Sequence, residues 1–276
     1  MMPGAVARRR LGYAAAIVVL LSAFIWMETL YAGALRRASF FNGWVLIAGV
    51  VFLALFNVRK KLPMIPLGSA SAWTRLHACL GFFTVGVFFL HGGFGIPQGT
   101  LDLALWAVFL IVALSGIGGL YLSRAVPARL GEVQERILLE RIPRFRAQLA
   151  REVAGIAERS IGEEVSLTIA SFYSETLHDF MRGPRNLLAH LRGSRQPLMA
   201  ICDSIKRIER YVDDAGRARL AEIRERVIAK NDLDCQYAHL LLLRLWLFVH
   251  IPATYSLIVL AAVHVMAAYA FSSGAP

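Results

Sequence analysis

Five long apolar blocks dominate the sequence and restrict what it can fold into. A helix needs about 20 apolar residues to cross a bilayer, and only the second block is clearly shorter than that. Of the 276 residues, 57% are hydrophobic and 18% are charged, which is more apolar matter than a soluble domain of this size would bury. Backbone groups inside a bilayer must be hydrogen-bonded within the segment, so we predict an all-α integral membrane protein with five transmembrane helices. The blocks cover residues 11–34, 42–58, 72–93, 101–123 and 239–271.

Basic residues predict how these blocks are oriented. Three arginines at residues 8–10 precede the first block, residues 59–61 are basic after the second, and Arg124 and Arg129 follow the fourth. Residues 95–100, after the third block, carry no charge. By the positive-inside rule we expect a bacterial inner-membrane protein with its N-terminus in the cytoplasm and its C-terminus outside. The third and fifth blocks then run parallel to each other, both from the cytoplasm outward.

The first block also has features of a signal peptide, because arginines precede it and small residues at 32–34 end it. Its apolar run of about 20 residues exceeds the usual length of roughly 7 to 15. We therefore expect an uncleaved transmembrane helix.

Four histidines lie in apolar blocks at matching intervals. His77 and His91 are fourteen residues apart in the third block, and His250 and His264 are fourteen apart in the fifth. Fourteen steps of about 100° return to within about 40° of the starting direction, so both rings of each block leave the same side of a helix. The rise separates the two levels by about 21 Å on both helices. With parallel helices, His77 and His250 share the cytoplasmic level, and His91 and His264 share the outer level.

Facing imidazoles at two depths in a helical bundle are typical of axial haem ligands. We expect His77 and His250 to bind the iron of a cytoplasmic-side haem, and His91 and His264 to bind the iron of an outer haem. An intramembrane histidine can also be a hydrogen-bonding residue or part of a proton path. A single zinc ion is disfavoured, because its ligands must lie within about 2 Å of it and the two levels are about 21 Å apart.

Other residues of these blocks suit a haem site but have ordinary explanations too. Gly81 and Thr84 lie on the histidine face of the third block, where small side chains would leave room for a porphyrin. Small residues are also common where membrane helices pack closely. Arg75 and Arg244, near the cytoplasmic ends, would either neutralise haem propionates or anchor the helices at the membrane surface.

The paired histidines, with the second pair opened by His250, Ile251 and Pro252, resemble the dihaem transmembrane cytochromes b. These include respiratory cytochrome b subunits and the membrane domain of ferric-reductase-like proteins. The resemblance spans the third to fifth blocks, less than half of the chain. It implies two haem b groups stacked across the bilayer, with electrons passing between a quinone or soluble donor and a partner on the other side. We find no flavin- or nicotinamide-binding domain after the last block, so we expect electrons to enter from another protein or from quinone.

The cysteines agree with non-covalent, b-type haem. Cys79, Cys202 and Cys235 are isolated in the sequence, which has neither the CxxCH attachment motif nor a set of four cysteines for an iron–sulfur cluster. We expect all three to be packing residues.

The segment at residues 125–236 has a different character. It carries most of the charged residues of both signs and shows helical periodicity, so we expect a mostly helical, cytoplasmic insert. It separates four transmembrane helices within residues 1–124 from a fifth within 237–276 that completes the bundle. We expect it to dock other subunits of a redox complex, whereas membrane lipid surrounds the helices. Lacking a net basic face or a recognition motif, it is not expected to bind nucleic acid.

Two further residues and two further functions stay open. His239, near the cytoplasmic surface, and Glu28, near the outer end of the first block, would either handle protons or quinone or have a simple structural role. The main expectation is an electron-transfer subunit rather than a self-contained enzyme. The alternatives are a quinol-oxidising or quinone-reducing enzyme subunit, and a haem-free proton-coupled transporter or assembly scaffold.

Overall fold

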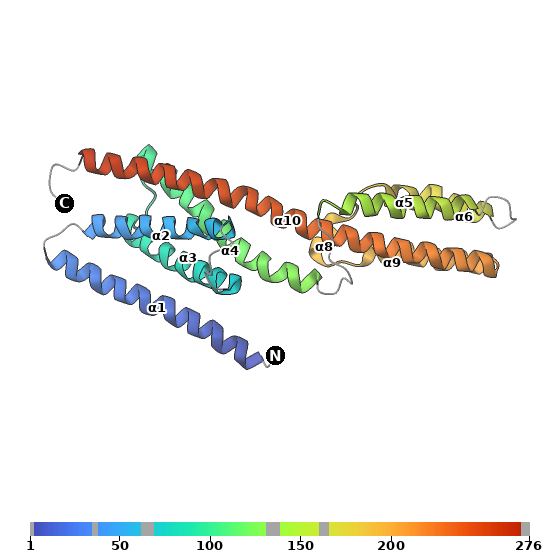
Figure 1. Ribbon diagram of the computed structural model, residues 1–276, viewed down its shortest axis with the longest axis horizontal. Coiled ribbons are helices and arrows are strands. Elements are labelled where there is room, and N and C mark those ends of the chain that lie inside the picture. Colours follow the sequence, from blue (N-terminus) through green and yellow to red (C-terminus); the bar gives the residue numbers. More distant parts are fainter. Residues whose placement is uncertain (1–2, 35–37, 62–68, 131–138, 160–165, 272–276) are drawn as a thin grey trace. The chain divides into compact units, whose positions relative to one another are not determined.

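The computed structural model describes residues 3–34, 38–61, 69–130, 139–159 and 166–271. These residues are all-helical, and none of them forms a β-strand, which confirms the all-α part of the predicted fold class. Among them, five helices are long and apolar enough to cross a membrane, as predicted from the apolar blocks (Figure 1). They are α1 (Pro3–Gly33), α2 (Ala38–Lys61), α3 (Ala70–Gly92), α4 (Thr100–Leu130) and α10 (Asp214–Phe271).

The chain forms two compact units. The first unit contains α1, α2, α3, most of α4 and the C-terminal part of α10, and these segments alternate in direction, so that α3 and α10 run the same way (Figure 1). Its core takes one buried residue from each of four helices, with Phe88 of α3 stacked on Phe109 of α4 at 3.8 Å between ring centroids. Val50 of α2 and Leu257 of α10 complete this core. Four helices thus share one apolar contact layer, which fixes the face that each presents to the others.

The helices extend beyond the apolar blocks. α2 begins at Ala38, four residues before its block, and α4 continues to Leu130. α10 runs without interruption from Asp214 to Phe271, so the expected boundary between residues 236 and 237 is not the start of a helix. The apolar blocks correspond to only the apolar part of each helix. The helices themselves continue into the polar residues that flank the blocks.

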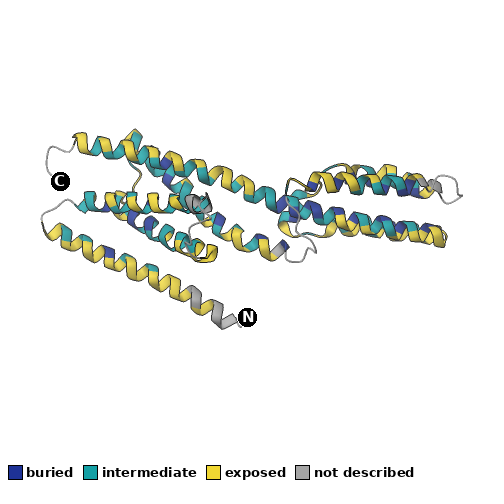
Figure 2. Ribbon diagram, viewed as in Figure 1, coloured by how far each residue is buried: buried dark blue, intermediate teal, exposed yellow. Residues whose placement is uncertain are grey.

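The second unit, Leu122–Leu245, contains the shorter helices and the N-terminal part of α10. The helices are amphipathic and turn their apolar residues towards a shared core that includes Val153, Ile205, Leu220 and Ile223. Figure 2 shows these buried positions along the helices. The elements are α5 (Ile142–Arg159), α6 (Ser166–Phe172), the π-helical turn η1 (Tyr173–Leu177), α7 (His178–Arg182), α8 (Leu187–Arg192), α9 (Gln196–Ile208) and the 3₁₀ turn η2 (Glu209–Tyr211).

A buried ionic cluster joins α10 to the rest of the second unit. The fully buried carboxylate of Asp234 accepts from Nζ of Lys230 at 2.6 Å and from the backbone N–H of Arg185 at 3.0 Å. Its other oxygen lies 3.1 Å from Nη2 of Arg146 on α5. Lys230 is fully buried as well, and its Nζ lies 3.9 Å from the centre of the Phe180 ring on α7. Asp234 is therefore the one carboxylate among these residues that balances Lys230 and Arg146.

Asp234→Ala should strongly destabilise the second unit. The substitution leaves a buried lysine without its counter-charge, which typically costs about 3–5 kcal/mol. Hydrogen exchange of the α5 and α9 amides in the intact protein would measure the loss. Asp214→Ala is the matched control, because the Asp214 carboxylate is 97% exposed and pairs with Arg217 at the surface, where ion pairs contribute little. Equal exchange in the two variants would contradict this account.

Candidate functional site

The structure brings together two of the four histidines of the apolar helices. The rings of His91 on α3 and His264 on α10 lie 6.4 Å apart between centroids and are nearly perpendicular, at 84°. Both line a cavity of about 700 Å³ in the first unit, bounded by residues of α2, α3, α4 and α10. Small-molecule and cofactor sites typically have about 300–1,000 Å³. Most of the lining side chains are apolar, so the two imidazoles lie close together in a mainly hydrophobic cavity.

The spacing of these rings fits a shared metal. Two metal–nitrogen bonds of about 2 Å, plus about 1 Å from each nitrogen to its ring centre, span about 6 Å. Gly43 of α2 lies close to one of these rings, because a Cβ added at Gly43 would lie 3.3 Å from Cε1 of His91. Trp106 lines the same cavity, and its buried Nε1–H has no hydrogen-bond partner among the described residues. The cavity thus offers two imidazoles and one indole N–H among apolar side chains.

Both α10 histidines are held through the same ring nitrogen. Nδ1 of His264 lies 3.0 Å from Oδ1 of Asp102 in the first turn of α4. Nδ1 of His250 lies 2.8 Å from Oγ of Ser115, whose single proton goes to the carbonyl of Val112 at 3.0 Å. Each acceptor therefore takes the Nδ1–H of its histidine. This tautomer leaves Nε2 of both rings with a free lone pair, as an axial ligand requires.

His77 and His250 have different neighbours in the structure. His77 packs against Phe56 of α2, with ring centroids 5.0 Å apart. His250 lies against α4, where it meets Ser115 and stacks on Trp246 at 5.6 Å. Their pairing on one iron thus stays a prediction, without the close approach that the rings of His91 and His264 have.

The other predicted residues of the histidine-bearing helices lie in varied surroundings. Thr84 is buried, donates to the carbonyl of Leu80 at 2.7 Å and packs against Gly49 of α2. These contacts favour a role in close helix packing over a role in making room for a porphyrin. A Cβ at Gly81 would meet nothing within 4 Å, so there is open space beside it. Arg75 and Arg244 are exposed, and their role towards propionates stays a prediction.

Several residues at these sites were not predicted from the sequence. Trp246 donates from Nε1 to the carbonyl of Ser115 at 2.7 Å and fills the space beside Gly119. Gly116 faces His250, where an added Cβ would lie 3.5 Å from Cε1. The small-residue run at 116–119 therefore accommodates a histidine and a tryptophan. Asp102 had a sequence signal, since it is a carboxylate at the outer end of an apolar block, where a polar partner is needed.

Glu28 and His239 are both engaged in polar contacts. Glu28 accepts from Nδ2 of Asn42 at 2.7 Å, which links α1 to α2. His239, in the second unit, is 2% exposed, and its Nδ1 lies 2.8 Å from the carbonyl of Cys235. Its Nε2 is buried without a hydrogen-bond partner among the described residues. A role for either residue towards protons or quinone stays a prediction.

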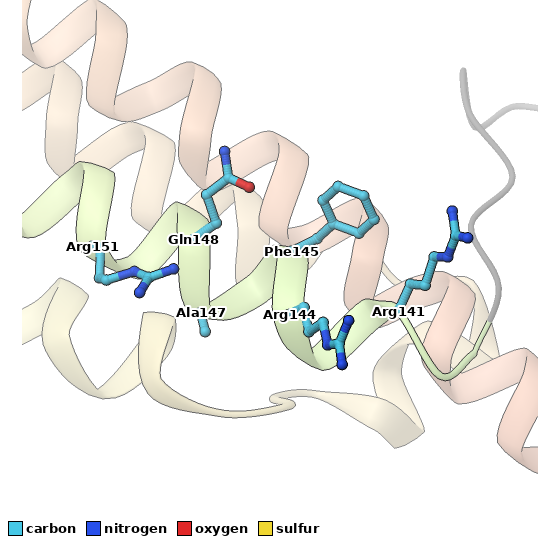
Figure 3. Close-up of a pocket in the computed structure, with 6 residues that line it drawn as sticks. All are labelled: Arg141, Arg144, Phe145, Ala147, Gln148 and Arg151. Carbon is cyan, nitrogen blue, oxygen red and sulfur yellow. The ribbon is translucent and has the colours of Figure 1, made fainter.

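The second unit also carries a basic surface groove. Arg141, Arg144 and Arg151 line a cavity of about 510 Å³ along one face of α5, together with Phe145, Ala147 and Gln148 (Figure 3). These residues come from one helix and the residue before it. They form an open, positively charged strip rather than a chamber for a cofactor. In the described part of the chain, no three His, Cys, Asp or Glu side chains are grouped to hold a metal ion.

No family model, curated protein or solved structure matches this chain.

Acid pH should destabilise the second unit through His190. Burial lowers the pKa of this histidine below its ordinary value of 6.5, aided by Lys230 and His239 and opposed by Asp234. In the unfolded chain the ring takes up a proton as the pH falls through about 6.5, whereas the folded state resists it, so stability falls below that pH. Hydrogen exchange of the α9 and α10 amides at pH 7.5 and pH 5.5 would measure the difference.

His190→Gln should reduce this pH dependence, because glutamine does not titrate. His178→Gln is the control, since His178 is 45% exposed. An undiminished pH dependence in the His190 variant would contradict the assignment.

Proposed function

We propose that the chain is a dihaem, b-type membrane cytochrome subunit that carries electrons across a membrane. The observation that carries the proposal is the apposition of His91 and His264 at 6.4 Å across a cavity of about 700 Å³. In the proposed assignment these residues ligate the outer haem iron, and His77 and His250 ligate the cytoplasmic-side haem iron. Haem supplies the one-electron chemistry.

The chain's own residues would bind and orient the two groups. Asp102 and Ser115 accept the Nδ1 protons of His264 and His250 and hold Nε2 free on each ring. Gly43 and Gly116 let α2 and α4 lie close to the rings of His91 and His250. Most of the side chains that line the outer cavity are apolar, which lowers the local dielectric around the centre.

The proposal places the protein in a bacterial inner membrane with the N-terminus in the cytoplasm. Five helices of sufficient length and apolar character support this, together with the distribution of basic residues. Residues 125–236 would be cytoplasmic and dock other subunits of a redox complex. The arginine strip of α5 supports an acidic partner surface, because opposite charges steer association. Electrons would enter from quinone or from a soluble partner.

A haem-free proton path is the second candidate. The contact of His264 with the half-exposed carboxylate of Asp102 favours it, since such pairs relay protons in transporters. The two candidates differ in one simple property, because a haem-free protein is colourless.

A reduced-minus-oxidised spectrum and a pyridine haemochrome assay of the purified protein test the proposal. We expect the absorbance of b-type haem and two haems per chain. His91→Ala and His264→Ala should each remove the same haem, because both substitutions take a ligand from one iron. His77→Ala and His250→Ala should each remove the other.

His178→Ala provides the matched control, since this histidine lies in the second unit and is 45% exposed. It should leave both haems in place. A colourless wild-type protein would overturn the proposal and leave the proton path as the better account.

A further inference from the structure

The outer pair of histidines is asymmetric in its surroundings. His264 has a carboxylate partner, with Nδ1 at 3.0 Å from Oδ1 of Asp102. Nδ1 of His91 is buried without a well-formed hydrogen bond, although the backbone of Ser39 approaches it. Within the described residues of the cavity lining, Asp102 is the one acidic side chain. His264 is thus in direct contact with a negative charge, and His91 is not.

The position of Asp102 is favourable for a carboxylate. It lies in the first turn of α4, where unpaired backbone N–H groups and the helix dipole stabilise negative charge. The turn is tight at this point, because a Cβ added at Gly99 would lie 3.1 Å from Oδ2 of Asp102. The backbone N–H of Leu103 donates to the carbonyl of Gly99 at 2.8 Å, which closes the turn around the aspartate. The carboxylate is therefore placed by α4 and reaches across to α10.

His250 provides an internal comparison on the same helix. Its Nδ1 partner is the neutral hydroxyl of Ser115, at 2.8 Å. Both contacts select the same tautomer, but only the contact of His264 brings a negative charge. A carboxylate behind an axial imidazole increases its electron donation, which stabilises the more positive, oxidised state of the metal.

We propose that Asp102 is the positioning residue of His264, and that its charge lowers the midpoint potential of the outer haem. This inference rests on the proposed function. Removing such a partner changes metal affinity by about 10–100-fold. If the oxidised state loses about tenfold relative to the reduced state, the potential rises by about 59 mV for a one-electron couple.

Redox titration of the purified Asp102→Asn variant, followed optically, tests the inference. Asparagine keeps a side-chain oxygen that accepts from Nδ1 but removes the charge. One of the two midpoint potentials should rise and the other should stay at its wild-type value. The low-spin electron paramagnetic resonance signal of the same haem should shift, because the axial ligand becomes a weaker donor.

Controls separate charge from folding. Asp102→Glu retains a carboxylate and should restore the lower potential. If Asp102→Asn does not accumulate, Asp102→Gln and Asp102→Glu repeat the comparison at equal side-chain length. Glu28→Gln removes another carboxylate of the first unit that does not line the cavity, and it should change neither potential.

Two outcomes are distinguishable. If the wild-type protein binds no haem, the proposed function itself fails. If it binds two haems and the charge-removing variants leave both potentials and both resonance signals unchanged, the assignment of Asp102 is wrong while the cytochrome proposal stands.

Discussion

Polar side chains within an apolar helix bundle need hydrogen-bond partners, and this constraint organises the first unit. Several of its polar side chains join different helices. Asp102 of α4 meets His264 of α10, and Glu28 of α1 meets Asn42 of α2. Ser115 of α4 meets His250, while its carbonyl accepts from Trp246. Each contact fixes the rotation of one helix against another, which apolar packing alone specifies weakly. The positions of the two α10 histidines thus depend on their partners on α4.

Glycine residues are the second requirement of this helix packing, because imidazole and indole rings need room that larger side chains would occupy. A Cβ at Gly49 would lie 2.8 Å from Oγ1 of Thr84, so α2 and α3 are nearly in backbone contact there. At the level of His91, a Cβ added at Gly43 would lie 3.3 Å from Cε1 of His91, so α2 also comes close to the ring there. Glycine therefore has the same use at both positions of α2. One glycine makes room for the side chain of Thr84 and the other makes room for the ring of His91.

These features explain which parts of the molecule were predictable. The fold class and the five long apolar helices follow from hydropathy, because a helix is the structure that satisfies its own backbone in an apolar medium. That His91 and His264 meet was expected from a fourteen-residue interval on two parallel helices. Asp102 and Ser115 were not predicted as their partners, since no spacing rule relates a residue of one helix to a residue of another whose rotation is unknown. The Asp234 cluster has the same origin, because it joins α10 to α5 and to the segment around Arg185.

The two α10 histidines show how one helix can provide similar ligands with different electrostatic surroundings. The fourteen-residue interval gives both rings the same direction, and the Nδ1 contacts give them the same tautomer. The partners then differ, with a charged carboxylate for His264 and a neutral hydroxyl for His250. Under the proposed function the chain would hold two redox centres, and equal ligands alone would give these centres nearly equal affinities for an electron. Unequal neighbours on α4 provide an internal difference without any change in the ligand pattern that the sequence displays.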